Sequence, residues 1–198
     1  MCAALSGAPA DGDTLFEIGS LSKTMTALGI SVLVTSGKMS FEDPVQKWLG
    51  PDFQLGPYDY VSRTVTVKDL LAHRTGLAQG QGDTLEAFMV AGDMMNALGD
   101  VIPMQSLRDV FQYSNAGWAV AGEVLRAAAN ASSWCDALHS VLLKPMGLNR
   151  TYCHRNEIPD DVAAAHVAAV HKHNPCGPDG AEGLATYDFV TTGVRNAL

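Results

Sequence analysis

The chain contains 198 residues, 47% of them hydrophobic and 17% charged, which is typical of one globular domain with a sizeable core. The formal net charge of -8 and the absence of any run of Lys and Arg disfavour nucleic acid as a partner, because binding phosphates requires a positive surface. No apolar stretch is long enough to span a bilayer, and the N-terminus lacks the basic start and apolar run of a signal peptide. We therefore expect a soluble protein and favour the cytoplasm, while the oligomeric state stays open.

The first expected element is a helix that ends at Gly37. Its apolar residues are spaced four, three and four apart, and they are Leu21, Met25, Leu28 and Val32. Because the segment is apolar nearly all round, we expect this helix to be buried.

The next segments give mixed signals. Asp43 followed by Pro44 predicts an N-cap and the first position of a short helix through Trp48. The stretch "YVSRTVTV", residues 60–67, alternates with a period near two and predicts a short strand.

Helical signals dominate from there to Leu148. Four further helices are expected: one from an N-cap at Thr66 to a stop near Gly76, one over 84–98, one capped by Asn115, and one from Ser132 or Ser133 to Pro145. Residues 171–183 then concentrate Pro, Gly and Asp, so we place the one organisational break near residue 170. The sequence thus predicts a single domain over 1–198 with an irregular tail over 170–198.

Four cysteines without short paired spacing favour reduced thiols over a disulfide framework, and they are Cys2, Cys135, Cys153 and Cys176. A zinc site is an alternative that six residues could supply: Cys153, His154, His166, His171, His173 and Cys176. Their spacing matches no regular zinc module, and histidines in a polar loop are usually solvated. We therefore expect neither a metal nor a cofactor.

The stretch "FEIGSLSKTM", residues 16–25, places two serines and a lysine in otherwise apolar surroundings. If a helix begins near Ser20, then Ser20 and Lys23 lie on one face, whereas Ser22 lies about 100° away from Ser20 around the axis. A serine hydroxyl becomes a good nucleophile when a base takes its proton, and a neutral lysine amine can be that base. The simpler alternative is an N-cap serine followed by a lysine that extends to solvent.

A second polar motif, "YSNAGW", begins at Tyr113 just before a predicted helix. A tyrosine near a lysine can relay protons, and Asn115 can hydrogen-bond the lysine and hold a substrate amide. The two motifs together favour acyl-transfer chemistry over the simpler alternative.

Four stretches in this order, "FEIGSLSKTMTA", "LLAHRTGL", "YSNAGWAVAGEVL" and "LLKPMGLNRTY", resemble the serine β-lactamase and penicillin-binding-protein superfamily, in particular its class C β-lactamase-related branch. The resemblance covers about residues 13–155. It implies that Ser20 is the acylated nucleophile, Lys23 its proton acceptor and Tyr113 the general base. It implies that Asn115 positions Lys23 and the substrate, and that the substrate is a small-molecule or peptide amide or ester.

The third family motif, a Lys or His followed by Thr or Ser and then Gly, has only a weak candidate at Thr191-Thr192-Gly193. Arg74-Thr75-Gly76 mimics that motif but precedes the tyrosine motif, and the resemblance implies that His73 and Asp69 pack and cap instead. The implied fold is α+β, of the β-lactamase/transpeptidase type, here as a helix-rich fragment that lacks much of the central antiparallel sheet. A chain of that kind is expected to turn over poorly, and a catalytically inactive remnant or interaction module is the alternative to a serine hydrolase.

Overall fold

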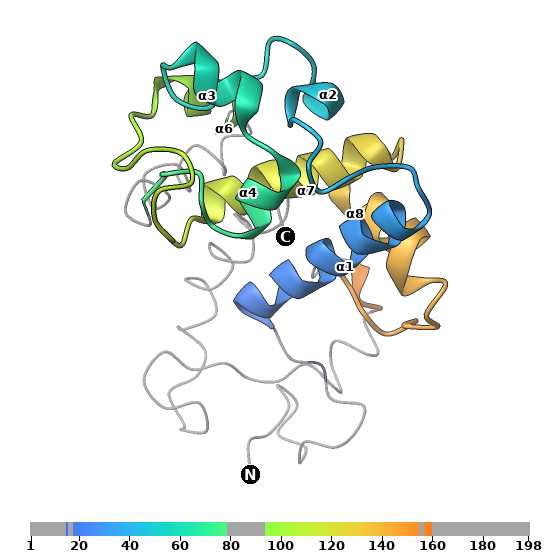
Figure 1. The fold of residues 1–198 in the computed structure, drawn as a ribbon. Coiled ribbons are helices and arrows are strands. Elements are labelled where there is room, and N and C mark those ends of the chain that lie inside the picture. The colour runs from blue at the N-terminus through green and yellow to red at the C-terminus, as the bar shows by residue number, and fades with distance from the viewer. Residues whose placement is uncertain (1–14, 16–17, 79–93, 155–156, 160–198) are drawn as a thin grey trace, which may run out of the picture. The chain divides into compact units, whose positions relative to one another are not determined.

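The computed structural model describes residues 15, 18–78, 94–154 and 157–159 (Figure 1). Residues 20–149 belong to one compact unit, and the described residues at 15, 18–19 and 150–159 belong to another. The helices and turns are η1 (Gly19–Leu21), α1 (Ser22–Thr35), α2 (Gln46–Leu49), α3 (Asp59–Thr64), α4 (Val67–Leu71), α6 (Met94–Ala97), η2 (Leu98–Asp100), α7 (Asn115–Ala128), α8 (Trp134–Leu138) and η3 (His139–Leu143). Within the described part of the chain no strand is formed, so the expected helix-rich character is confirmed there.

Helix α7 lies at the centre of the larger unit and contacts α1, α2, α4 and α8 (Figure 1). Most of its side chains are buried, and many of them are small, as in the run Ala119, Val120, Ala121 and Gly122. Small residues let neighbouring helices approach closely. Gly29 of α1 shows how close, since a Cβ there would lie 3.0 Å from a methyl carbon of Leu125.

Helix α1 ends at Thr35, close to the predicted stop at Gly37, but its burial does not match the prediction. Lys23, Ile30 and Leu33 are buried, whereas Leu28 and Val32 remain 43% and 42% exposed. The expectation of a helix buried nearly all round is therefore wrong for this structure. The side that is covered is the one that packs against α7 and α8.

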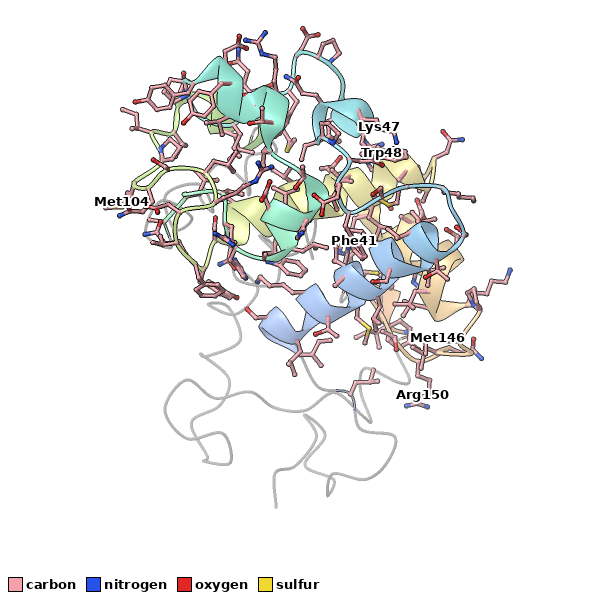
Figure 2. All side chains as sticks on the ribbon, viewed as in Figure 1. Phe41, Lys47, Trp48, Met104, Met146 and Arg150 are labelled. Atoms are coloured by element: carbon pink, nitrogen blue, oxygen red, sulfur yellow. The ribbon has the colours of Figure 1, made fainter. Side chains whose placement is uncertain are left out.

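Two local predictions between residues 43 and 67 are also wrong. Residues 60–67 form no strand, because 59–64 fold into α3, where Val61 is buried and Ser62 accepts a hydrogen bond from the Leu55 N–H at 2.9 Å. Asp43 does not cap α2, whose N-cap is Val45. Instead Asp43 accepts a hydrogen bond from Lys47, which also lies 5.0 Å from the Trp48 ring centre on α2 (Figure 2).

The predicted caps are right in part. Thr66 caps α4 in a reciprocal pair with Asp69, as expected. Ser133 is the N-cap of α8, which decides between the two serines proposed for it. Helix α7 is capped by Ser114 and not by Asn115, because the Ser114 hydroxyl accepts from the Gly117 N–H at 3.2 Å. The predicted helix over 84–98 lies largely outside the described residues.

A loop over residues 101–112 leads into Tyr113 and is held by the turn after α4. The Arg108 N–H donates to the Arg74 carbonyl at 2.8 Å, and the Met104 N–H donates to the Gly76 carbonyl at 3.0 Å. The Arg108 guanidinium also donates to the Asp69 carboxylate through two nitrogens. Its Nη2 lies 2.8 Å from Oδ2, and its Nε lies 2.9 Å from Oδ1. The side chain of Met104 lies at the outer edge of this loop and is 65% exposed (Figure 2).

Cys135 and Cys153 are each disulfide-bonded in the structure, so the expectation of reduced thiols is wrong for these two residues. Within the smaller unit the backbone N–H groups of Cys153 and His154 both donate to the Glu157 carboxylate, at 3.0 and 3.2 Å. The irregular tail predicted over 170–198 lies outside the described residues. No helix in the described part of the chain is long and apolar enough to cross a membrane.

Candidate active site

Ser20 lies in the 3-10 turn η1, immediately before α1. The α-helix proper begins at Ser22, two residues later than the start assumed from the sequence. One helical turn still brings Lys23 beside Ser20, and the Lys23 Nζ donates to the Ser20 Oγ at 3.3 Å. The predicted neighbourhood of these two side chains is therefore present in the structure.

Tyr113 and Asn115 reach the same place from the other side of the unit. Ser114 between them is extended, with φ -142° and ψ 116°. In an extended segment, residues i and i+2 project to the same side, while the residue between them projects to the other. Ser114 is accordingly buried as the cap of α7, while Tyr113 meets Ser20 of η1 and Asn115 meets Lys23 of α1.

The four side chains form a connected network. The Tyr113 hydroxyl lies 2.7 Å from the Ser20 Oγ, and either oxygen could donate the hydrogen bond. The Lys23 Nζ donates to the Asn115 Oδ1 at 2.9 Å and lies 5.0 Å from the centre of the Tyr113 ring. All four residues that the sequence singled out are thus brought together.

Burial differs across this network. Lys23 is only 6% exposed, whereas the Ser20 to Tyr113 hydrogen bond lies at the surface. No carboxylate forms an ion pair with Lys23 among the residues that the structure describes. A buried amine therefore contacts neutral oxygen atoms and an aromatic ring, and the hydroxyl it touches is open to an incoming molecule.

His73 is a fifth residue at the site, which sequence reasoning assigned to packing. It is 8% exposed, and its ring stacks on that of Tyr113 with centroids 4.5 Å apart. Burial, together with the positive charge of Lys23, lowers the pKa of His73 to about 4. The imidazole is therefore neutral near pH 7. No signal in one sequence distinguishes such a histidine from an ordinary core residue.

Asp69 has the capping role that the resemblance implied. Burial by itself would raise its pKa, but hydrogen bonds from Arg108, and then from the backbone and side chain of Thr66, hold it below the usual value. Asp69 contacts none of the four network residues directly, and it contributes by anchoring the 101–112 loop.

The remaining sequence candidates do not join this site in the described structure. Thr191-Thr192-Gly193 lies outside the described residues, as do His166, His171, His173 and Cys176 of the zinc alternative. Cys153 is disulfide-bonded, which removes the thiolate that a zinc ligand needs.

Comparison with known proteins decides the family. A family model described as Beta-lactamase matches residues 3–187. The chain belongs to the Beta-lactamase family. The resemblance to the serine β-lactamase and penicillin-binding-protein superfamily that its motifs indicated is thereby confirmed, and with it the membership in a family of serine hydrolases.

Individual relatives agree with this assignment. Penicillin-binding protein 4* of Bacillus subtilis is 29% identical in an alignment of 187 positions, which covers 88% of this chain and 39% of the relative. Penicillin-binding protein 4 of Amycolatopsis lactamdurans is 30% identical in an alignment of 172 positions, which covers 84% of this chain and 42% of the relative. This family member thus spans about two fifths of the length of these curated relatives.

The fold agrees as well. The solved structure of a class C beta-lactamase superimposes with a TM-score of 0.68 at 20% identity, over 94% of this chain and 56% of that one. The β-lactamase/transpeptidase type of fold is therefore present, and the described residues of this chain are rich in helix.

Proposed function

We propose that this chain is a serine hydrolase that forms an acyl-enzyme on Ser20 with an amide or ester substrate. One observation carries the proposal: the Ser20 Oγ contacts both the Tyr113 hydroxyl, at 2.7 Å, and the Lys23 amine, at 3.3 Å. A nucleophile with two adjacent proton carriers is the arrangement that acyl transfer requires.

The first step is acylation. As the Ser20 Oγ attacks the carbonyl carbon, its proton passes to Lys23 or to Tyr113, whichever is unprotonated, and a new C–O bond forms. Ser20 lies at the N-terminal end of the 14-residue helix α1, whose positive end favours the oxyanion of the tetrahedral intermediate. The bond to the leaving amine or alcohol then breaks, and that group takes a proton from Tyr113.

The second step is deacylation. A water molecule gives a proton to Tyr113 and attacks the ester carbonyl, and the Ser20 oxygen leaves with a proton from the Lys23 and Tyr113 pair. The carboxylic acid product departs and the original protonation is restored. Asn115 keeps the amine in place throughout, since its Oδ1 accepts from the Lys23 Nζ at 2.9 Å.

Supporting evidence for the substrate class comes from the relatives. Two of them are named for binding penicillin, which is a strained cyclic amide. A β-lactam is therefore the first reagent to try, and an activated ester is the second, because both present a carbonyl carbon to a serine oxygen.

The test is covalent labelling of the 198-residue chain with a fluorescent penicillin and with a fluorophosphonate, followed by denaturing gel electrophoresis. We expect Ser20→Ala to abolish the labelling. Ser22→Ala is the matched control and should retain most of it, because the hydroxyl of Ser20 is the one that contacts Lys23 and Tyr113. Equal loss in both variants would overturn the assignment of the nucleophile. A folded chain that takes no label would favour the inactive interaction module.

A further inference from the structure

His73 contacts four consecutive residues that lead into α7. Its ring meets the Phe111 ring edge-on at 5.3 Å, its carbonyl accepts from the Gln112 N–H at 2.8 Å, its ring stacks on Tyr113, and its Nδ1 lies 2.9 Å from the Ser114 N–H. Two of these contacts involve the backbone and two involve aromatic rings. One residue therefore fixes both the path of this segment and the plane of the Tyr113 phenol.

The second ring nitrogen is engaged as well. The Trp118 Nε1–H points at the Nε2 of His73 from 2.9 Å, so each nitrogen of the imidazole faces an N–H donor. An imidazolium carries an N–H on both nitrogens and could accept from neither donor, whereas a neutral imidazole keeps one bare nitrogen and accepts from one of the two. The two donors therefore favour the neutral ring, which adds no second positive charge beside Lys23.

The backbone of His73 is itself constrained. Its φ is +56°, in the left-handed region that side chains other than glycine adopt rarely and that Asn, Asp and His tolerate best. This conformation follows directly after α4, whose capping box fixes the start of the helix. The ring is thus constrained by its main chain and by the N–H donors that face its nitrogens.

We propose that His73 is the positioning residue for Tyr113 in the acylation of Ser20. The stacked imidazole sets the orientation of the Tyr113 phenol. The hydrogen bond from the Ser114 N–H to the His73 Nδ1 fixes the backbone next to Tyr113, so that the tyrosine hydroxyl stays within hydrogen-bond distance of the Ser20 Oγ. The inference rests on the proposed function, in which Tyr113 moves a proton. His73 touches neither the nucleophile nor the substrate.

The experiment compares two substitutions at this position. His73→Asn suits the positive φ and keeps an acceptor for the Ser114 N–H, whereas His73→Leu removes both the acceptor and the aromatic stack. Asn130→Leu is the matched control, because Asn130 has a φ of +54° at an exposed place after α7. Cooperative unfolding of each variant is checked before its reactivity is measured.

The readout is the rate of Ser20 acylation by a fluorescent penicillin, separated into the maximal rate and the half-saturating concentration. We expect His73→Leu to lower the maximal rate on the order of 10²-fold with little change in the half-saturating concentration, and His73→Asn to recover part of it. In a Tyr113→Phe background the His73→Leu change should cost little more, because His73 acts through the tyrosine. A folded His73→Leu chain that acylates at the wild-type rate would overturn the proposal, and so would a full loss that persists without the Tyr113 hydroxyl.

A second readout does not depend on reactivity. The ring protons of Tyr113 are shielded by the stacked imidazole, so their NMR resonances should move in His73→Leu and stay in place in Asn130→Leu. If the wild-type chain takes no label on Ser20, the proposed function fails and these resonances alone decide the role of His73. Unchanged Tyr113 resonances in His73→Leu would contradict it.

Discussion

The Tyr113 hydroxyl lies 2.7 Å from the Ser20 Oγ, although 93 positions separate the two residues in the sequence. Both residues lie immediately before a helix. Ser20 lies in the turn that precedes α1, and Tyr113 lies in the extended segment that precedes α7. Because α1 and α7 pack directly on each other, the meeting of the two oxygens depends on the packing of these helices.

Lys23 and Tyr113 should act as one proton-transfer unit. The double substitution Lys23→Met with Tyr113→Phe is expected to lower the rate of Ser20 acylation little more than the worse single substitution does, because either change already breaks the relay. Stopped-flow labelling with a fluorescent penicillin measures all four proteins of the cycle. Losses that multiply would mean that the two side chains work independently.

Stability should depend on pH through His73. Its pKa is about 4 in the folded chain against 6.5 for the free side chain, so the unfolded chain binds more protons between these values. The contribution of the neutral ring is fully present above pH 6.5 and is lost as the pH falls toward 4, at up to about 1.4 kcal/mol per pH unit. Urea unfolding of the wild type and of His73→Asn measures this, and their difference in unfolding free energy should shrink as the pH falls. A constant difference over that range would show that the histidine is not held neutral.

Gly76 should be intolerant of any side chain. A Cβ there would lie 2.1 Å from the Gln105 carbonyl oxygen at a φ of +84°, and it would push away the loop that leads to Tyr113. Gly37→Ala is the control, since Gly37 has a φ of +74° and nothing within 4 Å of the added atom. We expect Gly37→Ala to cost about 1 kcal/mol of unfolding free energy, from the backbone alone, and Gly76→Ala to cost clearly more. Equal costs in chemical denaturation would contradict the close packing of the loop.

The ion pair of Asp69 and Arg108 should matter more than the exposed pair of Asp59 and Arg63. Asp69 is 5% exposed, and replacing it by Asn removes the negative charge that faces Arg108 and leaves one amide oxygen where two carboxylate oxygens served Arg108 and the Thr66 cap. Asp69→Asn is expected to cost on the order of 2 kcal/mol of unfolding free energy, because hydrogen bonds to a charged group are weakened while Arg108 stays half-exposed. Asp59→Asn breaks the exposed pair with Arg63 and should cost less than about 1 kcal/mol. Thermal or urea unfolding of both variants gives the comparison, which fails if the two costs are alike.

The sequence predicts the core of the site because its signals are local. Ser20 and Lys23 are neighbours through a single helical turn, and Tyr113 and Asn115 are neighbours through one extended residue. Local spacing could not predict that Ser20 and Lys23 would contact Tyr113 and Asn115. That expectation came from the resemblance to a known family.

The failures have physical causes that a single sequence hides. The alternation in residues 60–67 also places Val61 and Val65 four residues apart, which suits a helix equally well, and packing decided for α3. In the sequence His73 looks like an ordinary core residue, and only the structure shows that its ring stacks on that of Tyr113. The exposed side of α1 could not be foreseen either, because apolar composition alone does not show which face a neighbour covers.

The most direct test of the central claim is mass spectrometry of the intact 198-residue chain after incubation with a penicillin. The account predicts a mass increase of one intact penicillin, since opening of the β-lactam ring expels no atoms, and peptide mapping should place the adduct on Ser20. Ser20→Ala should show no increase. An adduct on any other residue, or an equal increase in the Ser20→Ala chain, would contradict the account.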